Sequence, residues 1–516
     1  MNGAQALMQT LSDSGVEVCF ANPGTSEMHL VAALDEQHGM RAVLGLFEGV
    51  VTGAADGYGR MSDKPAATLL HLGPGLANGL ANLHNARRAL SPIVNIVGDH
   101  AVDHIALDAP LTSDIVGVAT PMSDWVTTST STSNLAEAGS EAVAIACRYP
   151  GQIATVIAPG DHAWTDGAAA AAPATPPEVP RVSDEQIEAA AKLLRKPGQS
   201  ALFIGNRALR EQALFQAGRV ATATKARLIS DTSPARLQRG VGRVTVQRIP
   251  YFAESAIEFM KGIERLIFIG TKPPVSFFAY PNRPSVLSPE GADIMRLADE
   301  RVDAEDTLRR LADTLSAPDQ PIHLQASKEL PIVEDGPLDQ TSLGIITAQL
   351  LPENAIVSDE GVSSGGQVYR YSAGAPQHDW MTITGGAIGQ GLPLATGAAI
   401  ACPGRKVIAL QADGSAMYTV QALWTMAREN LDVTVIILKN NSYGILNIEL
   451  DRVGVTAPGP KALSLLDLSN PIIDWVAMSH SMGVPAQSAS TTQEFRAALS
   501  AAVAHDGPRL VEAVLA

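Results

Sequence analysis

Short runs of β-branched and aliphatic residues alternate along the chain with longer, alanine-rich stretches of helical periodicity. The runs predict strands, and the stretches between them predict helices. This alternation is typical of parallel βα units with right-handed crossovers, in which ligands lie beyond the carboxyl ends of the strands. The predicted strands are 16–20, 67–71, 93–97, 201–205, 226–230, 266–270, 355–358, 407–411 and 433–438.

Two proline-containing stretches interrupt this alternation. The first, 165–180, is rich in alanine and proline and predicts an extended linker. The second, 317–337, mixes prolines with charged residues before a fresh set of strands and helices begins. We therefore expect an α/β protein with three doubly wound parallel-sheet domains, in residues 1–165, 181–316 and 338–516.

Composition narrows the functional classes. The 516 residues are 46% hydrophobic and 17% charged, as in ordinary globular proteins. The formal net charge of -16 disfavours nucleic acid and anionic membrane surfaces as partners. Three widely spaced cysteines, without a C-x-x-C pair, a signal peptide or a long apolar run, predict a cytoplasmic protein without a membrane span.

The stretch from Val407 onward carries the first candidate for chemistry. It reads as an apolar strand, an acidic turn at Asp413, a helix, a second apolar strand and an amide turn at Asn440. If the two strands are parallel neighbours, Asp413 and Asn440 lie together at their carboxyl ends. One carboxylate and one amide oxygen suit Mg²⁺, which takes further oxygens from phosphate. The alternative is that Asp413 only caps the following helix.

This pair of turns resembles the magnesium and diphosphate motif of thiamine-diphosphate-dependent enzymes. Asp-Gly-Ser is followed, 27 residues after Asp413, by Asn-Asn. The usual motif opens Gly-Asp-Gly, whereas Ala412 here takes the first position, which supplies backbone room and no ligand. The resemblance implies that Mg²⁺ is held by one carboxylate, one side-chain amide and one backbone carbonyl. These metal ligands would be Asp413, Asn440 and Ser442, with Gly414 and Ser415 contacting the cofactor.

Glu48 is the second candidate. It stands between an apolar run and a helix rich in small residues, where a carboxylate would be poorly solvated. Taken alone, Glu48 also fits an ordinary acidic residue in the first turn of a helix. The run 46–60 resembles the thiamine-activating segment of the same family. The resemblance implies that Glu48 binds the cofactor, protonates its aminopyrimidine ring and so turns the cofactor's amino group into an internal base.

Two loops that follow strands of the first domain closely resemble those of benzoylformate decarboxylases. They are the loop 22–27 and the loop that begins at His71, although Gly-Pro-Gly at 73–75 is more similar to acetolactate synthases. The resemblance implies that Thr25 and His71 face the substrate as catalytic residues. A histidine at the end of a strand is also often only a hydrogen-bonded structural residue.

The glycine-rich stretch 384–391 fits a dinucleotide-binding loop poorly, because the strand before it is short and no acidic residue ends a next strand. In the family, this segment precedes the metal motif. The resemblance implies that the Gly386 carbonyl receives the pyrimidine amino group and that Ile388 holds the cofactor bent. Ordinary core packing is the alternative for Ile388. Ser363, in a turn after another strand, offers a hydroxyl and amides to the diphosphate.

The resemblance covers nearly the whole chain and implies a pyrimidine-binding domain, a middle Rossmann-like domain and a diphosphate-binding domain. It is closest to acetolactate synthase large subunits and benzoylformate decarboxylases. Thiamine diphosphate and Mg²⁺ are the expected cofactors, and FAD is not expected because 182–316 has no dinucleotide fingerprint. The apolar run 275–280 offers no second substrate-facing histidine. One histidine would slow protonation of the enamine and favour carboligation or a different substrate.

The predicted activity is therefore decarboxylation of a 2-oxo acid, followed by protonation or carboligation of the enamine. The alternative is a non-catalytic relative that binds the cofactor or a partner subunit. Because the family places its cofactor between two chains, the resemblance implies at least a dimer, and a tetramer is expected. Neither the substrate nor the roles of His100 and His104 follow from the sequence.

Overall fold

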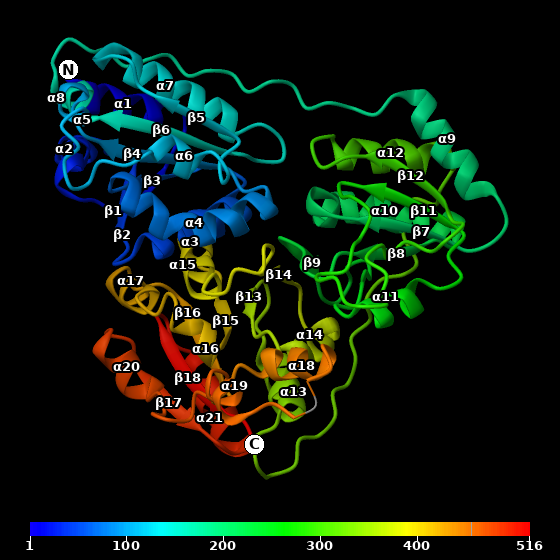
Figure 1. The fold of residues 1–516 in the computed structure, drawn as a ribbon. Helices are drawn as coiled ribbons and strands as arrows, with labels where there is room; N and C mark the ends of the chain where they lie inside the picture. Colours follow the sequence, from blue (N-terminus) through cyan, green and yellow to red (C-terminus); the bar gives the residue numbers. More distant parts are fainter. Residues whose placement is uncertain (456) are drawn as a thin grey trace.

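The computed structural model describes residues 1–455 and 457–516, and it contains three sheets covered by helices on both faces (Figure 1). This arrangement confirms the predicted fold class, and each predicted strand is present within two residues of its expected bounds. The central strands of the sheets are buried on both faces, which explains why the sequence shows continuous aliphatic runs there rather than alternation. Among the described residues, no helix combines the length and apolar character needed to cross a lipid bilayer.

The first sheet has six parallel strands in the order β2-β1-β3-β4-β6-β5. Its strands are β1 Val18–Asn22, β2 Arg41–Leu44, β3 Ala66–Leu70, β4 Ile93–Asp99, β5 Trp125–Thr128 and β6 Ile153–Pro159. The helices around it are α1 Gly3–Asp13, η1 Thr25–Glu27, α2 Met28–Asp35, α3 Glu48–Ser62, α4 Leu72–Ala89, α5 Val102–Ile105, α6 Ile115–Ala119, α7 Thr132–Ala146 and α8 Gly160–Trp164.

The middle sheet has five parallel strands in the order β10-β8-β7-β11-β12. Its strands are β7 Ser200–Ile204, β8 Arg227–Ser230, β10 Gln247–Arg248, β11 Arg265–Ile269 and β12 Asp293–Ala298. Its helices are α9 Asp184–Arg195, η2 Asn206–Leu209, α10 Glu211–Thr224, α11 Ala253–Met260 and α12 Ala304–Thr314.

The last sheet has seven strands in the order β17-β18-β16-β15-β13-β14-β9. Its strands are β9 Leu237–Arg239, β13 Ile356–Glu360, β14 His378–Thr382, β15 Val407–Ala412, β16 Val433–Lys439, β17 Ala486–Ala489 and β18 Arg509–Val514. Its helices are α13 Gln340–Leu350, α14 Gly366–Tyr371, η3 Ser372–Gly374, α15 Gly391–Ala401, α16 Asp413–Ala416, α17 Ala422–Arg428, α18 Gly444–Arg452, α19 Pro460–Ser464, α20 Trp475–Ser481 and α21 Thr492–Val503.

One strand crosses a domain boundary that the sequence analysis drew. β9 lies in the middle third of the chain, yet it pairs antiparallel with β14 and forms the edge of the last sheet. The pairing joins Arg239 to His378 and Leu237 to Trp380. No residue pattern predicts this pairing, because a three-residue strand is too short to produce a periodic pattern.

The first and last domains share one hydrophobic core, in which α3 packs directly on α15. Small residues make the close approach possible. A Cβ added at Gly57 would lie 2.1 Å from the Leu394 carbonyl oxygen, and one at Gly397 would lie 1.8 Å from the Ala54 carbonyl oxygen. Gly57 of α3 and Gly397 of α15 therefore allow the two domains to approach each other this closely.

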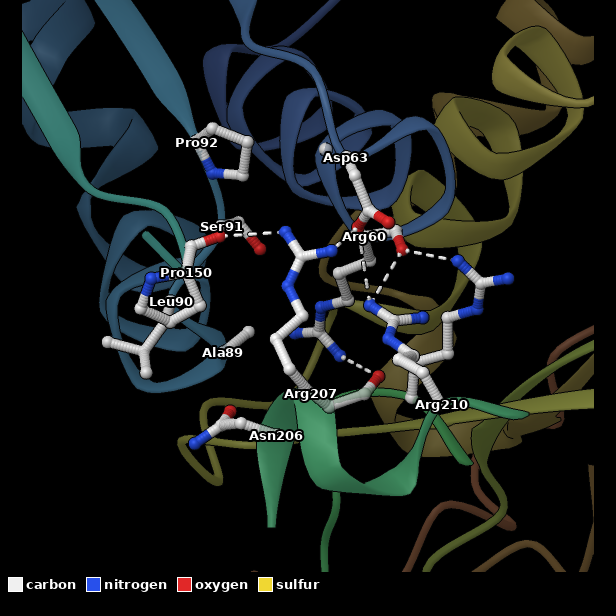
Figure 2. A pocket seen from close by; sticks show the side chains of 13 residues that line it. Arg60, Asp63, Ala89, Leu90, Ser91, Pro92, Pro150, Asn206, Arg207 and Arg210 are labelled. Carbon is white, nitrogen blue, oxygen red and sulfur yellow. Dashed lines mark hydrogen bonds and ion pairs between the residues drawn. The ribbon is translucent and has the colours of Figure 1, made fainter. Parts of the chain in front are cut away.

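Arginine side chains fill the junction between the first and middle domains (Figure 2). Arg207 pairs with Asp63 at 2.6 Å, and Arg210 approaches the same carboxylate at 3.5 Å. Burial, together with the neighbouring Arg236, lowers the pKa of Arg210 well below its ordinary value. The cavity among these side chains holds about 20 Å³, room for roughly one water molecule. The cluster is therefore a packed joint between domains.

Candidate active site

The predicted metal turns lie side by side. β15 and β16 are parallel neighbours, as expected, with Ala412 opposite Leu438 in register. Asp413 begins α16 directly after β15, and Asn440 follows β16. The Asp413 Oδ2 atom accepts hydrogen bonds from the backbone amides of Asn440 at 3.1 Å and Asn441 at 2.7 Å. The structure thus brings together the two turns that the sequence separates by 27 residues.

Asp413 is held rigidly from three sides. Its Oδ1 atom accepts from the Gly414 amide at 2.9 Å, in addition to the two bonds to Oδ2. Asp413 is only 3% exposed, and burial raises the pKa of its carboxyl group, whereas these backbone bonds lower it. The Asn440 Oδ1 atom accepts from the Ser442 amide at 3.0 Å, which orients the amide side chain. A Cβ at Gly414 would lie 2.5 Å from the Tyr443 ring, so this position requires glycine.

The donor set fits a hard cation that phosphate also ligates. Asp413, Asn440 and Ser442 offer only oxygens, which Mg²⁺ prefers. Within residues 1–455 and 457–516, no cluster of three or more His, Cys, Asp or Glu side chains forms a metal cage. A bound divalent cation would offset the cost of burying the Asp413 charge. These residues therefore fit a metal that is completed by a diphosphate.

Ser363 and Ser415 lie beside these turns. A Cβ at Gly444, where α18 starts, would lie 3.2 Å from Ser363 Oγ and 3.4 Å from Asn440 Nδ2. Ser415 Oγ accepts from Gln411 Nε2 at 2.5 Å and donates to the Ala412 carbonyl at 3.1 Å. The predicted diphosphate contacts thus lie together at the carboxyl ends of central strands of the last sheet.

Glu48 is the first residue of α3 and is 9% exposed. Its Oε2 atom accepts one hydrogen bond, from Asn78 Nδ2 of α4, at 3.0 Å. Helix α4 can lie this close because residue 75 is a glycine. A Cβ at this position would stand 3.1 Å from Glu48 Oε1, which is a tight contact. The start of α3 therefore presents a buried carboxylate with unused hydrogen-bonding capacity, as a proton-transfer group requires.

His71 forms a dyad with a residue that the sequence analysis left without a role. Its Nδ1 atom lies 2.8 Å from Oε2 of Glu27, whose side chain is fully buried, and 3.2 Å from Ser26 Oγ. Glu27 also accepts the Gly24 amide at 2.8 Å. A Cβ at Gly24 would lie 2.1 Å from the His71 ring, so the loop needs glycine there. The buried carboxylate favours a proton on Nδ1, which makes Nε2 the acceptor atom of the neutral ring.

Thr25, which we expected to face the substrate, is exposed, and the hydroxyl beside His71 belongs to Ser26. His100 and His104, which follow β4, pack on each other with ring centroids 5.3 Å apart. The role of Thr25 stays a prediction.

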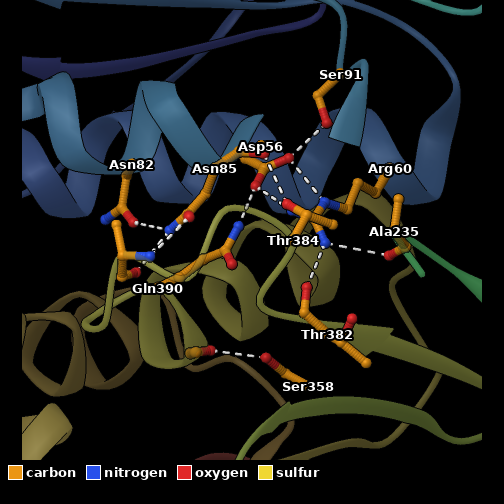
Figure 3. Close-up of polar contacts among 12 residues, drawn as sticks. Asp56, Arg60, Asn82, Asn85, Ser91, Ala235, Ser358, Thr382, Thr384 and Gln390 are labelled. Carbon is orange, nitrogen blue, oxygen red and sulfur yellow. Dashed lines mark hydrogen bonds and ion pairs between the residues drawn. The ribbon is translucent and has the colours of Figure 1, made fainter. Parts of the chain in front are cut away.

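The glycine-rich stretch is held between the first and last domains (Figure 3). Gly386 has a φ of +76°, and a Cβ there would lie 2.7 Å from the Phe277 ring, so only glycine fits. Asn85 Nδ2 donates to the Ala387 carbonyl at 2.7 Å. Ile388 is only partly buried, which argues against ordinary core packing and leaves its side chain available to a ligand.

Left-handed backbone conformations occur in three of these segments. Leu72, directly after His71, has a φ of +47°, and Val362, next to Ser363, has a φ of +42°. Asn441, next to Asn440, has a φ of +52°. Such conformations are unusual for Leu and especially for β-branched Val, and they cluster at functional sites where the surroundings enforce them.

Glu48 and Asp413 belong to different halves of the site. Glu48 bonds to Asn78 in the first domain, and Asp413 bonds to backbone amides of the last domain. In the part of the chain that the structure describes, no hydrogen bond or ion pair links the two carboxylates. The sequence analysis gave no role to Glu27, Asn78 or the buried Glu360, although all three stand in segments that follow predicted strands and drew attention for that reason.

Comparison with known proteins matches both halves of the site to one family. Residues 1–118 match the N-terminal TPP binding domain of thiamine pyrophosphate enzymes, and residues 362–513 match their C-terminal TPP binding domain. A Mycobacterium tuberculosis protein, provisionally named acetolactate synthase large subunit IlvX, is 50% identical over 516 residues, which are 100% of this chain and 99% of the relative. Benzoylformate decarboxylase of Pseudomonas aeruginosa is 27% identical over 98% of this chain and 97% of its own.

Solved structures share the fold. The thiamine diphosphate-dependent 4-hydroxybenzoylformate decarboxylase of Rhodococcus jostii RHA1 superposes with a TM-score of 0.88 at 24% identity, covering 100% of this chain and 99% of that chain. Benzoylformate decarboxylase of Polynucleobacter necessarius gives a TM-score of 0.84 at 21% identity, covering 100% and 98%.

Proposed function

Because the chain belongs to the thiamine pyrophosphate enzyme family, we propose that it uses thiamine diphosphate and Mg²⁺ to decarboxylate a 2-oxo acid. The carbons that remain leave as an aldehyde or are transferred to a second carbonyl compound. The observation that carries this proposal is the combination, in one chain, of the under-bonded carboxylate of Glu48 with the paired turns of Asp413 and Asn440. A relative that had lost catalysis would have no need to keep both.

Asp413, Asn440 and the Ser442 carbonyl would hold the metal, and Ser363, Gly414 and Ser415 would contact the diphosphate. The backbone amides that bind Asp413 keep its carboxylate in place before any ligand arrives, so little order has to be gained on binding. Gly386 and Ile388 would position the aromatic part of the cofactor. When bound, thiamine diphosphate supplies the nucleophilic carbon and the electron sink for cleavage of the carbon–carbon bond.

Glu48 would exchange a proton with the cofactor's pyrimidine ring. A carboxyl group that is 9% exposed would transfer this proton away from bulk water, and among the described residues Asn78 is the only donor to its side chain, at Oε2. The His71 imidazole, oriented by Glu27, would hold or move a proton at Nε2 near the substrate. The apolar residues around Phe277 would exclude water from the same space.

The complete site would form between chains of a homodimer, which can assemble further into a tetramer. Support comes from large apolar side chains that stay exposed next to the predicted site residues. Leu46 is 44% exposed, Met417 is 41% exposed and Tyr418 is 53% exposed. A second copy of the chain would cover them. Light scattering tests this assembly, and a mass near one chain would contradict it.

The function is tested by measuring carbon dioxide release with thiamine diphosphate and Mg²⁺ from pyruvate, benzoylformate and branched 2-oxo acids, with the second product identified. Glu48→Gln is the control for background decarboxylation. Release with an aldehyde or hydroxyketone product supports the proposal and identifies the substrate class. Tight cofactor binding without release from any of these acids would instead support a non-catalytic relative.

A further inference from the structure

Helix α3 carries more than Glu48. Two turns after that carboxylate, the same helix presents Asp56, and one turn later it presents Arg60. Asp56 is fully buried and Arg60 is 2% exposed. The proposed reaction does not use either residue. A buried ion pair adds little stability compared with apolar packing, so its retention calls for a specific role.

Every N–H of the Arg60 guanidinium has a partner. Nε and Nη2 donate to the two Asp56 oxygens at 2.8 and 2.7 Å. Nη1 donates to the carbonyls of Ala235 at 3.1 Å and Thr382 at 2.8 Å, and Nη2 also donates to Thr384 Oγ1 at 3.1 Å. A guanidinium has five N–H donors, and all five are used, on groups from all three domains.

Asp56 contacts the other end of the stretch 382–390, whose first residues bind Arg60. Besides Arg60, its carboxylate accepts from the Ser91 hydroxyl and from Gln390 Nε2. Figure 3 shows Thr382 and Thr384 below Arg60, with Gln390 below Asp56. The ion pair therefore holds 382–390 at both ends, and Gly386 and Ile388 lie between the two anchors.

Helix α4 fixes the middle of the stretch. Asn85 both donates to the Ala387 carbonyl at 2.7 Å and accepts from the Ala387 amide at 3.2 Å. His84 Nε2 lies 3.1 Å from the Gly385 carbonyl oxygen. Thr384 ties the two sets of contacts together, because its hydroxyl donates to the Asn85 carbonyl at 2.7 Å while it accepts from Arg60.

We propose that Asp56 and Arg60 are positioning residues that set the location of Gly386 and Ile388 relative to α3, the helix that begins at Glu48. The helix acts as a spacer of about 12 Å between Glu48 and Asp56, since each residue adds about 1.5 Å. A shift of this stretch would move the groups that contact the pyrimidine ring, and a misplacement of about 1 Å can cost about a hundredfold in rate. This inference rests on the proposed cofactor role of Gly386 and Ile388.

The chain contains a matched pair for the test. Asp306 and Arg310 in α12 have the same spacing of four residues and also form an ion pair, at 3.2 Å, but they lie in the middle domain. Asp56→Asn in α3 and Asp306→Asn in α12 each remove the negative charge from an ion pair with a spacing of four residues. Both Thr384→Val and Gln390→Met leave the Asp56–Arg60 pair itself intact. Gln390→Met removes the bond from Gln390 to Asp56, and Thr384→Val removes the bond from Arg60 together with the bond to the Asn85 carbonyl.

The experiment measures thiamine diphosphate affinity by isothermal titration in the presence of Mg²⁺, together with kcat and the melting temperature. Asp56→Asn should weaken cofactor binding by about ten- to a hundredfold, the usual effect of removing a residue that orients a ligand-binding group. Thr384→Val and Gln390→Met should weaken it by a smaller factor, whereas Asp306→Asn should leave the affinity unchanged. Far-UV circular dichroism establishes that each variant is folded.

Wild-type affinity in Thr384→Val, Gln390→Met and Asp56→Asn would overturn the inference. An equal loss in Asp306→Asn would also overturn it, because the effect would then reflect general stability. If Asp56→Asn does not fold, the affinities of Thr384→Val and Gln390→Met decide the result. The inference and the proposed function fail separately: a wild-type protein that binds the cofactor without releasing carbon dioxide refutes only the function.

Discussion

Glu48 and Asp413 occupy similar places and have very different surroundings. Each is a buried carboxylate at the first position of a helix, and each lies within a segment that matches the same enzyme family. Asp413 accepts three backbone amides, whereas Glu48 accepts a single side-chain amide from Asn78. The difference suits two tasks. A carboxylate that accepts several backbone amides is held in place and suits a ligand-binding role, whereas a carboxylate with fewer hydrogen-bond donors around it suits proton exchange.

The largest expected effect comes from removing the proton of Glu48. Glu48→Gln keeps an oxygen that can accept from Asn78, so the helix and the cofactor site should stay intact. We expect kcat to fall by about a thousandfold, within the range for loss of a general acid or base. Cofactor affinity measured by titration should change little. A variant with wild-type kcat would contradict the role of Glu48.

Asp413→Asn should show the opposite behaviour. The loss of the negative charge should weaken binding of the proposed Mg²⁺, and with it cofactor affinity, by about a hundredfold, whereas turnover at saturating cofactor should recover in part. Removal of the metal from the wild-type protein with EDTA should produce the same loss of affinity, and added Mg²⁺ should restore it. Unchanged cofactor affinity in the variant would place the metal elsewhere.

His71 tests whether proton transfer is divided between two groups. His71→Ala should slow the steps after carbon dioxide release by about a hundredfold. Glu27→Gln should slow them less, because the imidazole remains and only its orienting carboxylate loses its charge. His480→Ala, in α20, is the control and should have wild-type kinetics. Single-turnover kinetics separate these steps, and equal rates in all four proteins would make His71 a structural residue.

The smallest effect is expected at the position where the chain departs from the usual motif. Ala412 has a φ of -69° and a ψ of 144°, an extended conformation that is open to any residue. Ala412→Gly should therefore bring no gain in cofactor affinity and should lower the free energy of unfolding by up to about 1 kcal/mol. Thermal unfolding and titration check both values, and a large gain in affinity would show that the motif is impaired.

The sequence predicts best what repeats or has a fixed spacing. Continuous aliphatic runs located the central strands, and strand order made Asp413 and Asn440 neighbours. Glu27 escaped because its role depends on a contact with His71, 44 residues away, between two irregular loops. The pairing of β9 was not predicted, because it depends on the open edge of β14 and not on a pattern in the three residues of β9. Contacts between loops and between domains have no period, so residue patterns do not reveal them.

The position of β9 in the last sheet limits how the middle domain can be replaced. Without it, β14 would end the last sheet with an unpaired edge, which is a common starting point for aggregation. Recombination that replaced the middle domain would have to bring a suitable strand in the same place, or leave that edge open. The middle third of the chain therefore protects the edge of the last sheet, although the family motifs lie in the first and last thirds.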